Sequence, residues 1–544
     1  MTVPGLDLAA LEAGTRAPGL SRTKTSHWQR IGAVVAVLGA LAWAGGQLDL
    51  TGRALVNGRG FAELGRFFAA AVRPRTSPEI LRAAFTGTKV TLSYALLGTI
   101  ASVGIGLMFG VVLCRARTEG KHTAISGACR VLLAPIRGAH EVLWALLFAS
   151  VLGINPLVAV LAIALPFGAV TARVFSEILD AQPTAPYDAL RAGGARRFSA
   201  FVLGIVPGAL NDGTSYTFYR FECAVRSAAV LGVVGAGGLG EQLRLSFLEA
   251  DYRGMWSFLW CLIALSAIVE FGSGRIRKRA VSVAQKRTFT RRTLATLTLA
   301  GMAWWTLGVD VATLWSARTR RLAGETMSQW FPADFSLDHR QILVPLARET
   351  LAISIASLFI SLTLAVPLAL LTTRSTDAGR IRLLASSFGR FVLLITRALP
   401  PSVWAYLAVL VLFPGPLPAA VALGIYNAGV LGRLLGEVLE NLDQRPRSAL
   451  RASGASPATA TILGILPTAS PLFAGYGLYR WEVAMRETIM VGIVAAGGLG
   501  AHLNQRLAAF DWPEVTATIA VLIGLTFLVD LTSTGFRRYL LRRS

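Results

Sequence analysis

The sequence predicts an all-α polytopic membrane protein, with about twelve transmembrane helices arranged as two parallel six-helix repeats. Of its 544 residues, 54% are hydrophobic and only 15% are charged, and the mean hydropathy is +0.57. A soluble chain of this size needs more charge to cover its surface. Long apolar runs recur along the chain, and the second half repeats the first. These observations together predict the fold class.

The apolar runs give the positions of the expected helices. Most of them approach the roughly 20 residues that cross a hydrocarbon core. In the first half they are Ile31–Gly46, Leu92–Cys114, Val131–Leu152, Leu157–Leu179 and Ser257–Phe271. In the second half they are Leu294–Leu307, Leu351–Leu371, Phe391–Phe413, Leu417–Leu439 and Val515–Leu531. One further apolar helix is expected before each glycine-rich stretch, near Gly238 and Gly498, which makes about six per half.

The distribution of positive charge predicts the orientation. The net charge is +23, which in a soluble chain would indicate nucleic-acid binding. Here the basic residues cluster at helix ends, in a loop from Arg115 to Arg130, in the stretch Arg275–Arg292 and at the C-terminus from Arg537. The positive-inside rule makes these segments cytoplasmic, although the loop after the first helix is also basic. We expect a bacterial inner-membrane protein with both termini in the cytoplasm, in contact with lipid and not with nucleic acid.

Two kinds of cofactor site are not predicted. The four cysteines, Cys114, Cys129, Cys223 and Cys261, all lie in the first half without metal-ligand spacing, so we interpret them as free thiols. The phosphate-binding pattern G-x-x-x-x-G-K-[ST] is missing from the chain. We therefore expect no metal and no cofactor here, and ATP to be bound elsewhere.

The halves align at a fixed offset almost without gaps. Tyr219–Gly240 matches Tyr479–Gly500 with more than half of the positions identical. Six helices per half place both copies the same way up, as parallel repeats about an axis along the membrane normal. The expected organisation is a cytoplasmic segment at residues 1–30, a first repeat at 31–277, a basic cytoplasmic linker at 278–292 and a second repeat at 293–544.

A polar segment interrupts each half at matched positions. Alternating alanine, leucine and arginine suit a short amphipathic helix, after which glycine permits a turn and proline starts the next helix. By the predicted topology both segments are cytoplasmic. In the first half the residues are Asp188, Ala189, Leu190, Arg191, Gly194, Ala195 and Pro207; in the second they are Ser448, Ala449, Leu450, Arg451, Gly454, Ala455 and Pro467.

These two loops resemble the E-A-A-x-x-x-G loop of binding-protein-dependent ABC importer permeases. In that family the loop forms a coupling helix that docks into the ATPase subunit. The resemblance implies two coupling loops and two copies of an ATPase subunit, which bind ATP and magnesium. The leading glutamate of the family pattern is Asp188 in the first copy and Ser448 in the second, so the docking contacts are expected to be unequal.

A second segment carries charge into the membrane. We expect Glu222 to pair with Arg226, and Glu482 with Arg486, because each pair is four residues apart on a helix. One interpretation is a structural ion pair; the other is that the arginines attract an oxyanion along the pathway. The glycines are expected to allow a backbone turn or close helix packing near the non-cytoplasmic face. The candidate pathway residues are Tyr219, Arg220, Glu222, Arg226, Gly237, Gly238, Tyr479, Arg480, Glu482, Arg486, Gly497 and Gly498.

Two arginines outside this segment also recur. Arg137 and Arg397 each precede a tryptophan near the cytoplasmic end of a helix. We interpret them as side chains that reach towards the lipid headgroups.

These motifs resemble the phosphonate-type permease most closely. The pattern Y-R-W-E-x3-R, the following G-A-G-G-L-G and the stretch Phe331–Ser336 carry that resemblance. It implies a permease that is not itself an enzyme, moving phosphonate or phosphate inward by alternating access, with an extracytoplasmic binding protein as partner. A methionine-type or other small-solute ABC importer permease, a secondary transporter and a membrane scaffold remain alternatives.

Overall fold

The described part of the protein is almost entirely helical. The computed structural model describes residues 27–48, 56–115, 124–153, 155–280, 286–330, 332–373, 380–495 and 497–541. The described residues form no β-strand, and one isolated bridge joins Val56 and Leu412. Nearly all of the predicted segment 1–30 lies outside the described residues, as do Arg117, Lys121, Phe331 and the centre of the predicted linker.

The helices follow one another in the same order in both halves. The first half contains α2 (His27–Gln47), α3 (Gly58–Ala70), α4 (Pro78–Leu113), α5 (Ala124–Gly138), α6 (Glu141–Leu152), α7 (Pro156–Asp180), α8 (Ala185–Ala192), α9 (Arg197–Gly204), α10 (Val206–Leu231), the π-helical turn η2 (Gly232–Ala236), α11 (Gly238–Leu248) and α12 (Tyr252–Ala280). The second half contains α13 (Lys286–Leu307), the 3-10 turn η3 (Val311–Trp315), α14 (Ala317–Trp330), α15 (Leu337–Thr372), α16 (Arg380–Ala398), α17 (Pro401–Val411), α18 (Pro416–Asn441), α19 (Arg445–Ala452), α20 (Pro457–Gly464), α21 (Leu466–Ala495), α22 (Gly498–Ala508) and α23 (Trp512–Leu541).

The membrane-crossing elements agree with the prediction of a polytopic helical protein. Six described helices are long and apolar enough to cross a bilayer, namely α4, α7, α12, α15, α18 and α23. Four bent pairs bring the number to ten. The helices α2 and α13 occupy the first position of each half, and the described apolar part of α2 is Val35–Gln47. The predicted linker is mostly helical, because α12 continues to Ala280 and α13 begins at Lys286.

Two of the predicted spans are sharply bent. The run at 131–152 is divided into α5 and α6, which meet at 92°, and the run at 391–413 into α16 and α17, which meet at 96°. In the second half Pro400 and Pro401 interrupt the helix, since proline removes a backbone donor. In the first half His140 caps α6, accepting a hydrogen bond from the Val142 backbone N–H at 3.2 Å.

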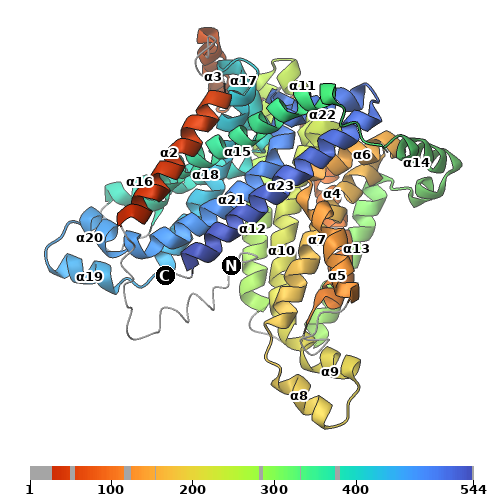
Figure 1. Ribbon diagram of the computed structural model, residues 1–544, viewed down its shortest axis with the longest axis horizontal. Coiled ribbons are helices and arrows are strands. Elements are labelled where there is room, and N and C mark those ends of the chain that lie inside the picture. The colour runs from red at the N-terminus through yellow and green to blue at the C-terminus, as the bar shows by residue number, and fades with distance from the viewer. Residues whose placement is uncertain are drawn as a thin grey trace.

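The first helix of each half packs on the other half. α2 lies along α15, and α13 lies along α4 (Figure 1). Ala44 of α2 is buried in one cluster with Ile353 of α15, whereas Ala303 of α13 belongs to the core of the first half. Each bundle is therefore built from most of one half and the first helix of the other.

The two ends of the molecule differ in shape. The helix pair α8 and α9 and the helix pair α19 and α20 both lie at one end, which we call the lower end, and the two pairs are far apart there (Figure 1). The helices α11, α17 and α22 lie at the opposite, upper end. Between the ends, α4 packs closely on α7 through small residues. A Cβ added at Gly98 would lie 2.8 Å from Ile163, and one added at Gly168 would lie 2.7 Å from Ile105. Such close approach of small residues is the usual basis of helix packing in membranes.

Candidate functional site

The two polar segments form equivalent helix pairs at the lower end. α8 holds Asp188, Ala189, Leu190 and Arg191, and α19 holds Ser448, Ala449, Leu450 and Arg451. Gly194 and Gly454 end these helices with φ values of +85° and +87°, a left-handed conformation that favours glycine. Pro207 and Pro467 lie in the first turns of α10 and α21, as predicted.

The same capping motif closes both helices. The Ala195 backbone N–H donates to the Leu190 carbonyl at 3.0 Å, and the Gly194 N–H donates to the Arg191 carbonyl at 3.0 Å. This is the Schellman arrangement, and Ala455, Leu450, Gly454 and Arg451 repeat it at the same distances. The two segments have the same glycine conformation and the same capping hydrogen bonds. Each of them therefore presents a short helix with an exposed face.

The glycine-rich segments make turns at the upper end. Gly237 and Gly238 have φ values of +93° and +78°, and Gly498 has φ +64°, whereas Gly497 is extended. A Cβ on Gly238 would lie 2.6 Å from the Thr91 hydroxyl, and one on Gly498 would lie 2.6 Å from the Thr350 hydroxyl. The expected turn and close packing are confirmed at these glycines, and none of them lines the central cavity described next.

A central cavity lies between the two halves and has two lobes. Lobe 1, of about 430 Å³, is bounded by α5, α7 and α10 of the first half and by α21 and α23 of the second. Lobe 2, of about 570 Å³, is bounded by α10 and α12 of the first half and by α16 and α18 of the second. Each lobe therefore uses corresponding helices with the halves exchanged, as expected of two parallel repeats.

All eight predicted tyrosine, arginine and glutamate residues line this cavity. Tyr219, Arg226, Tyr479 and Arg480 line both lobes. Arg220, Glu482 and Arg486 line lobe 1, whereas Glu222 lines lobe 2. The repeated motif thus places its charged side chains at the interface of the two halves.

The predicted ion pairs along one helix are not formed. Among the described residues, no salt bridge joins Glu222 to Arg226 or Glu482 to Arg486. The Glu482 carboxylate instead pairs with Arg537 of α23, and Arg486 donates to the backbone carbonyl of Glu482 at 3.3 Å. The Glu222 carboxylate accepts a hydrogen bond from Ser273 of α12. Neighbouring helices therefore provide partners for both carboxylates.

Ion pairs between the halves involve residues that the sequence did not place in the pathway. Glu270 of α12 accepts hydrogen bonds from Arg397 of α16 at 2.9 and 2.8 Å and also pairs with Arg433 of α18. The prediction that Arg397 reaches towards headgroups is therefore wrong. The equivalent contact joins Asp530 to Arg137 at 3.9 Å. The repeat alignment contained a signal, because Glu270 matches Asp530 and Arg397 matches Arg137.

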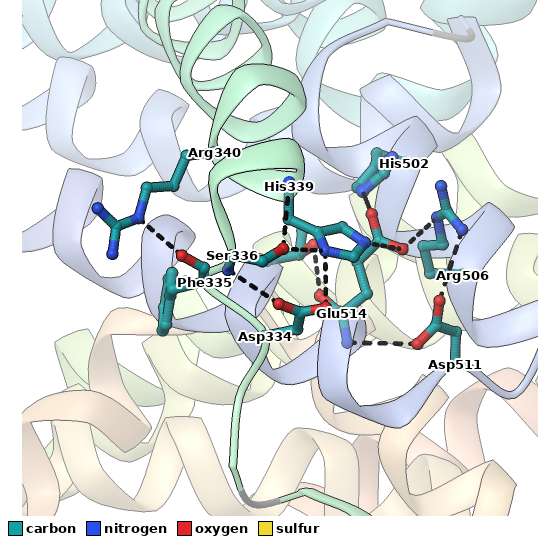
Figure 2. A network of polar contacts seen from close by, with 10 residues as sticks. Asp334, Phe335, Ser336, His339, Arg340, His502, Arg506, Asp511 and Glu514 are labelled. Atoms are coloured by element: carbon teal, nitrogen blue, oxygen red, sulfur yellow. Dashed lines mark hydrogen bonds and ion pairs between the residues drawn. The ribbon is translucent and has the colours of Figure 1, made fainter.

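A polar network built on a buried carboxylate lies at the upper end of the second half. In the first half the loop before α4 is joined to the start of α12 by other contacts, among them a salt bridge between Arg75 and Asp251 at 3.0 Å. The network of the second half connects the loop before α15 with α22 and α23 (Figure 2). The buried Glu514 carboxylate lies 2.8 Å from Arg506 Nε, 3.0 Å from His502 Nε2 and 3.4 Å from His339 Nε2.

The loop end of this network includes the described part of the Phe331–Ser336 stretch. Asp334 accepts a hydrogen bond from the Ser336 backbone N–H at 2.9 Å, and its carboxylate lies 2.7 Å from His339 Nδ1. The Ser336 hydrogen bonds and the nearby imidazole lower the pKa of Asp334. These contacts hold the loop against the start of α15. The described part of the Phe331–Ser336 stretch therefore has a structural role.

Within the described ranges, no group of three or more His, Cys, Asp or Glu side chains could hold a metal ion. The four cysteines are free thiols there. The main functional feature of the structure is a cavity lined by charged side chains. It lies between two helix bundles, each of which has an equivalent helix pair at the lower end. Such a fold and cavity define a multi-pass membrane permease.

The comparisons with known proteins give the family. Residues 131–281 and 365–544 match the family described as "Binding-protein-dependent transport system inner membrane component", one match in each half and together more than half of the chain. The chain belongs to this family, and it is a permease component of the inner membrane. The family works with a binding protein and an ATPase.

Curated relatives and one solved structure resemble the chain. The Phosphate-import permease protein PhnE of Mycolicibacterium smegmatis is 26% identical, over 82% of this chain and 84% of the relative. The Phosphite transport system permease protein PtxC of Stutzerimonas stutzeri is 33% identical, over 44% of this chain and 84% of the relative. An inward-facing MetNI methionine ABC transporter chain matches with a TM-score of 0.34 and 21% identity, over 38% of this chain and 99% of that one.

Proposed function

We propose that this chain forms the whole transmembrane pathway of an ABC importer for phosphorus oxyanions such as phosphate, phosphite or phosphonates. The observation that carries the proposal is the cavity between the halves, into which both copies of the Tyr-Arg-x-Glu-x3-Arg motif project. Arginine suits such ligands because its planar guanidinium donates several hydrogen bonds to oxygen atoms of an oxyanion. The names of the phosphate and phosphite relatives support the same substrate class.

The lower end is the proposed ATPase-binding face. One ATPase subunit would bind α8 with α9, and a second would bind α19 with α20, so that both copies contact one chain. Exposed small residues support this role, because Ala189 and Ala449 leave room for a partner surface. The lower end would then be cytoplasmic, with both termini on that side and the basic clusters obeying the positive-inside rule.

The upper end is the proposed docking face for an extracytoplasmic binding protein. In this arrangement the chain itself performs no covalent chemistry. Closure of the ATPase subunits on ATP and magnesium would move the two helix pairs together and change which end of the cavity is open. The sequential organisation into repeats at 31–277 and 293–544, joined at 278–292, supports this because each repeat supplies one helix pair.

A charge placed on the exposed face of the helix pairs tests the coupling part. Ala189→Glu with Ala449→Glu should abolish ATP-driven uptake and copurification of the ATPase, because a buried carboxylate without a partner opposes docking. Ala317→Glu, an exposed position on α14, is the matched control and should leave both unchanged. ATP-driven uptake at the wild-type rate in the double variant would exclude these helices as the coupling elements.

Uptake in proteoliposomes tests the substrate part. The full chain would be reconstituted with its ATPase and binding protein and supplied with phosphate, phosphite, methylphosphonate or methionine. We expect accumulation of at least one phosphorus oxyanion and none of methionine. Accumulation of methionine alone would overturn the proposed substrate class.

A further inference from the structure

The two lobes of the central cavity have corresponding helices but different charge. Among the described residues, seven arginines and four carboxylates line lobe 1, whereas four arginines and four carboxylates line lobe 2. A small anion in such a low-dielectric site responds strongly to this difference. The lobes are therefore not equivalent as binding sites.

Lobe 2 has its arginines engaged by carboxylates. Glu270 contacts both Arg397 and Arg433, and the Arg397 side chain is only 14% exposed. Arg433 also contacts Glu437 at 2.9 Å. Because these bonds join α12 of the first half to α16 and α18 of the second, lobe 2 fastens the halves together and leaves these two guanidinium groups already neutralised.

Lobe 1 lacks this engagement. Asp530 replaces Glu270 and is one methylene shorter, and its carboxylate lies 3.9 Å from Arg137. Arg173, the equivalent of Arg433, has within the described part of the chain a salt bridge to Glu177 of its own helix alone, at 2.9 Å. Arg137 therefore keeps most of its hydrogen-bonding capacity.

A second arginine of lobe 1, Arg220, is buried without a salt bridge to any described carboxylate. Arg220 is 8% exposed, its guanidinium lies 4.0 Å from the centre of the Phe167 ring, and its Nε has no hydrogen-bond partner. No salt bridge joins it to any described residue. In the second half Asn427 replaces Phe167 and Glu487 replaces Ser227, and Arg480 contacts both Asn427 and Glu487. Burial of an unpaired charge is costly unless a ligand supplies the missing counter-charge.

Among the described residues no carboxylate of lobe 1 forms a salt bridge with Arg220, although Glu141 interacts with it electrostatically from beyond salt-bridge distance. Glu482 pairs with Arg537, and Glu487 with Arg480 at 3.5 Å. Glu141 accepts a hydrogen bond from Ser227 and lies 3.5 Å from His140. Arg486 of the same lobe donates to backbone carbonyls, at 3.3 Å to Arg137 and 3.3 Å to Glu482.

We propose that the chain has one oxyanion-binding site, in lobe 1, formed by Arg137, Arg220 and Arg486, and that lobe 2 is a structural lock between the halves. This rests on the proposed function, since it assigns a place to the anion carried there. The ligand class is a tetrahedral phosphorus oxyanion with one or two negative charges. The anion therefore binds in one of the two lobes, although the fold consists of two equivalent repeats.

Exchange of the equivalent carboxylates tests the site. Asp530→Glu reproduces the longer side chain of lobe 2 and should capture Arg137, so that equilibrium dialysis with radiolabelled inorganic phosphate shows several-fold weaker binding to the purified full chain in nanodiscs. Glu270→Asp, the reverse change in lobe 2, should leave phosphate affinity within twofold. Arg220→Gln should weaken binding by about tenfold or more, the usual cost of losing a charge-assisted hydrogen bond.

The stoichiometry gives an independent readout. Wild-type chain should bind one phosphate, and gel filtration with thermal unfolding would confirm that each variant is folded. Two equal phosphate sites, no saturable phosphate binding, or unchanged affinity in both folded Asp530→Glu and Arg220→Gln chains would overturn the proposal. If the complete transporter accumulates phosphate while Asp530→Glu and Glu270→Asp behave alike, the one-sided site fails and the proposed function stands. If wild-type accumulates only methionine, the proposed function fails.

Discussion

Single residues at the upper end show how the second half is stabilised. Glu514 is fully buried at the start of α23, and its carboxylate lies within ion-pair distance of Arg506 and two histidines (Figure 2). The equivalent position in the first half is Gly254, which has no carboxylate, and there a salt bridge between Arg75 and Asp251 joins the corresponding loop to the start of α12. Through the Glu514 carboxylate the network connects the loop before α15 to α22 and α23, in addition to the backbone hydrogen bond from the Asp334 N–H to the Pro513 carbonyl at 3.1 Å.

Glu514→Gln should therefore destabilise the protein. The substitution keeps the shape but removes the buried charge beside Arg506. Because the Arg506 side chain is 32% exposed and also contacts Asp511, the cost is about 1–2 kcal/mol, between that of an exposed and that of a buried ion pair. Thermal unfolding of the detergent-purified protein should show a lowered midpoint. Glu325→Gln is the control, because its contact with Arg321 on α14 is exposed, and exposed pairs contribute little. Equal midpoints for the two variants would contradict the assigned part of Glu514.

Local sequence predicted some residues well and others poorly. The glycine turns at Gly194 and Gly454 follow from backbone preferences that neighbouring residues determine, so they could be predicted. The partner of Glu482 could not, because Arg537 approaches it only after α21 and α23 pack together. Helix spacing alone predicted Arg486 as the partner of Glu482, but packing of α21 against α23 brings Arg537 closer. Equivalence of Glu270 and Asp530 was visible in the repeat, but the pairing of each with the opposite half required the fold.

At the scale of elements, the halves differ after the charged helix. In the first half α10 ends at Leu231 and continues as the π-helical turn η2, where Gly235 has φ +105°. In the second half α21 runs unbroken to Ala495, the equivalent of Gly235. π-Helical turns are frequent at functional sites, and this one lies between the Arg226 turn of α10 and the α11 turn.

Gly235→Ala should lower the stability of the first half. No atom lies within 4 Å of an added Cβ, so the cost arises from the left-handed backbone alone and amounts to about 1–2 kcal/mol. The midpoint of thermal unfolding measures it. Gly104→Ala in α4 is the matched control, because its Cβ also meets open space and its backbone is helical; it should be neutral or slightly stabilising. A Gly235→Ala protein as stable as the Gly104→Ala protein would argue against this conformation.

At the scale of the whole molecule, the two halves hold one another. α2 of the first half packs on α15, α13 of the second packs on α4, and Glu270 joins α12 to α16 and α18. Hydropathy predicted these helices but not which bundle each would join, because an apolar run does not specify its partner. Because each half packs against helices of the other, we expect neither half to fold stably by itself.

A chain divided between α12 and α13 should therefore reassemble. Residues 1–280 and 281–544, coexpressed with a tag on one of them, should copurify in detergent, and the pair should support ATP-driven uptake. Either piece produced alone should be degraded or aggregated, because its first helix and its lobe face lack their partner surfaces. Isolation of each piece as a stable monomer would show that the crossed packing is dispensable.

The crossed first helices also impose an order on synthesis in the membrane. α2 is inserted first, yet α15, on which it packs, is made only after the whole first half and the linker have been translated. During that interval the face of α2 that carries Ala44 is in contact with lipid or with helices that it must later leave. Contacts between residues so distant in sequence form late and slowly. Quality-control proteases of the membrane would therefore encounter the first half in an incomplete state each time the protein is made.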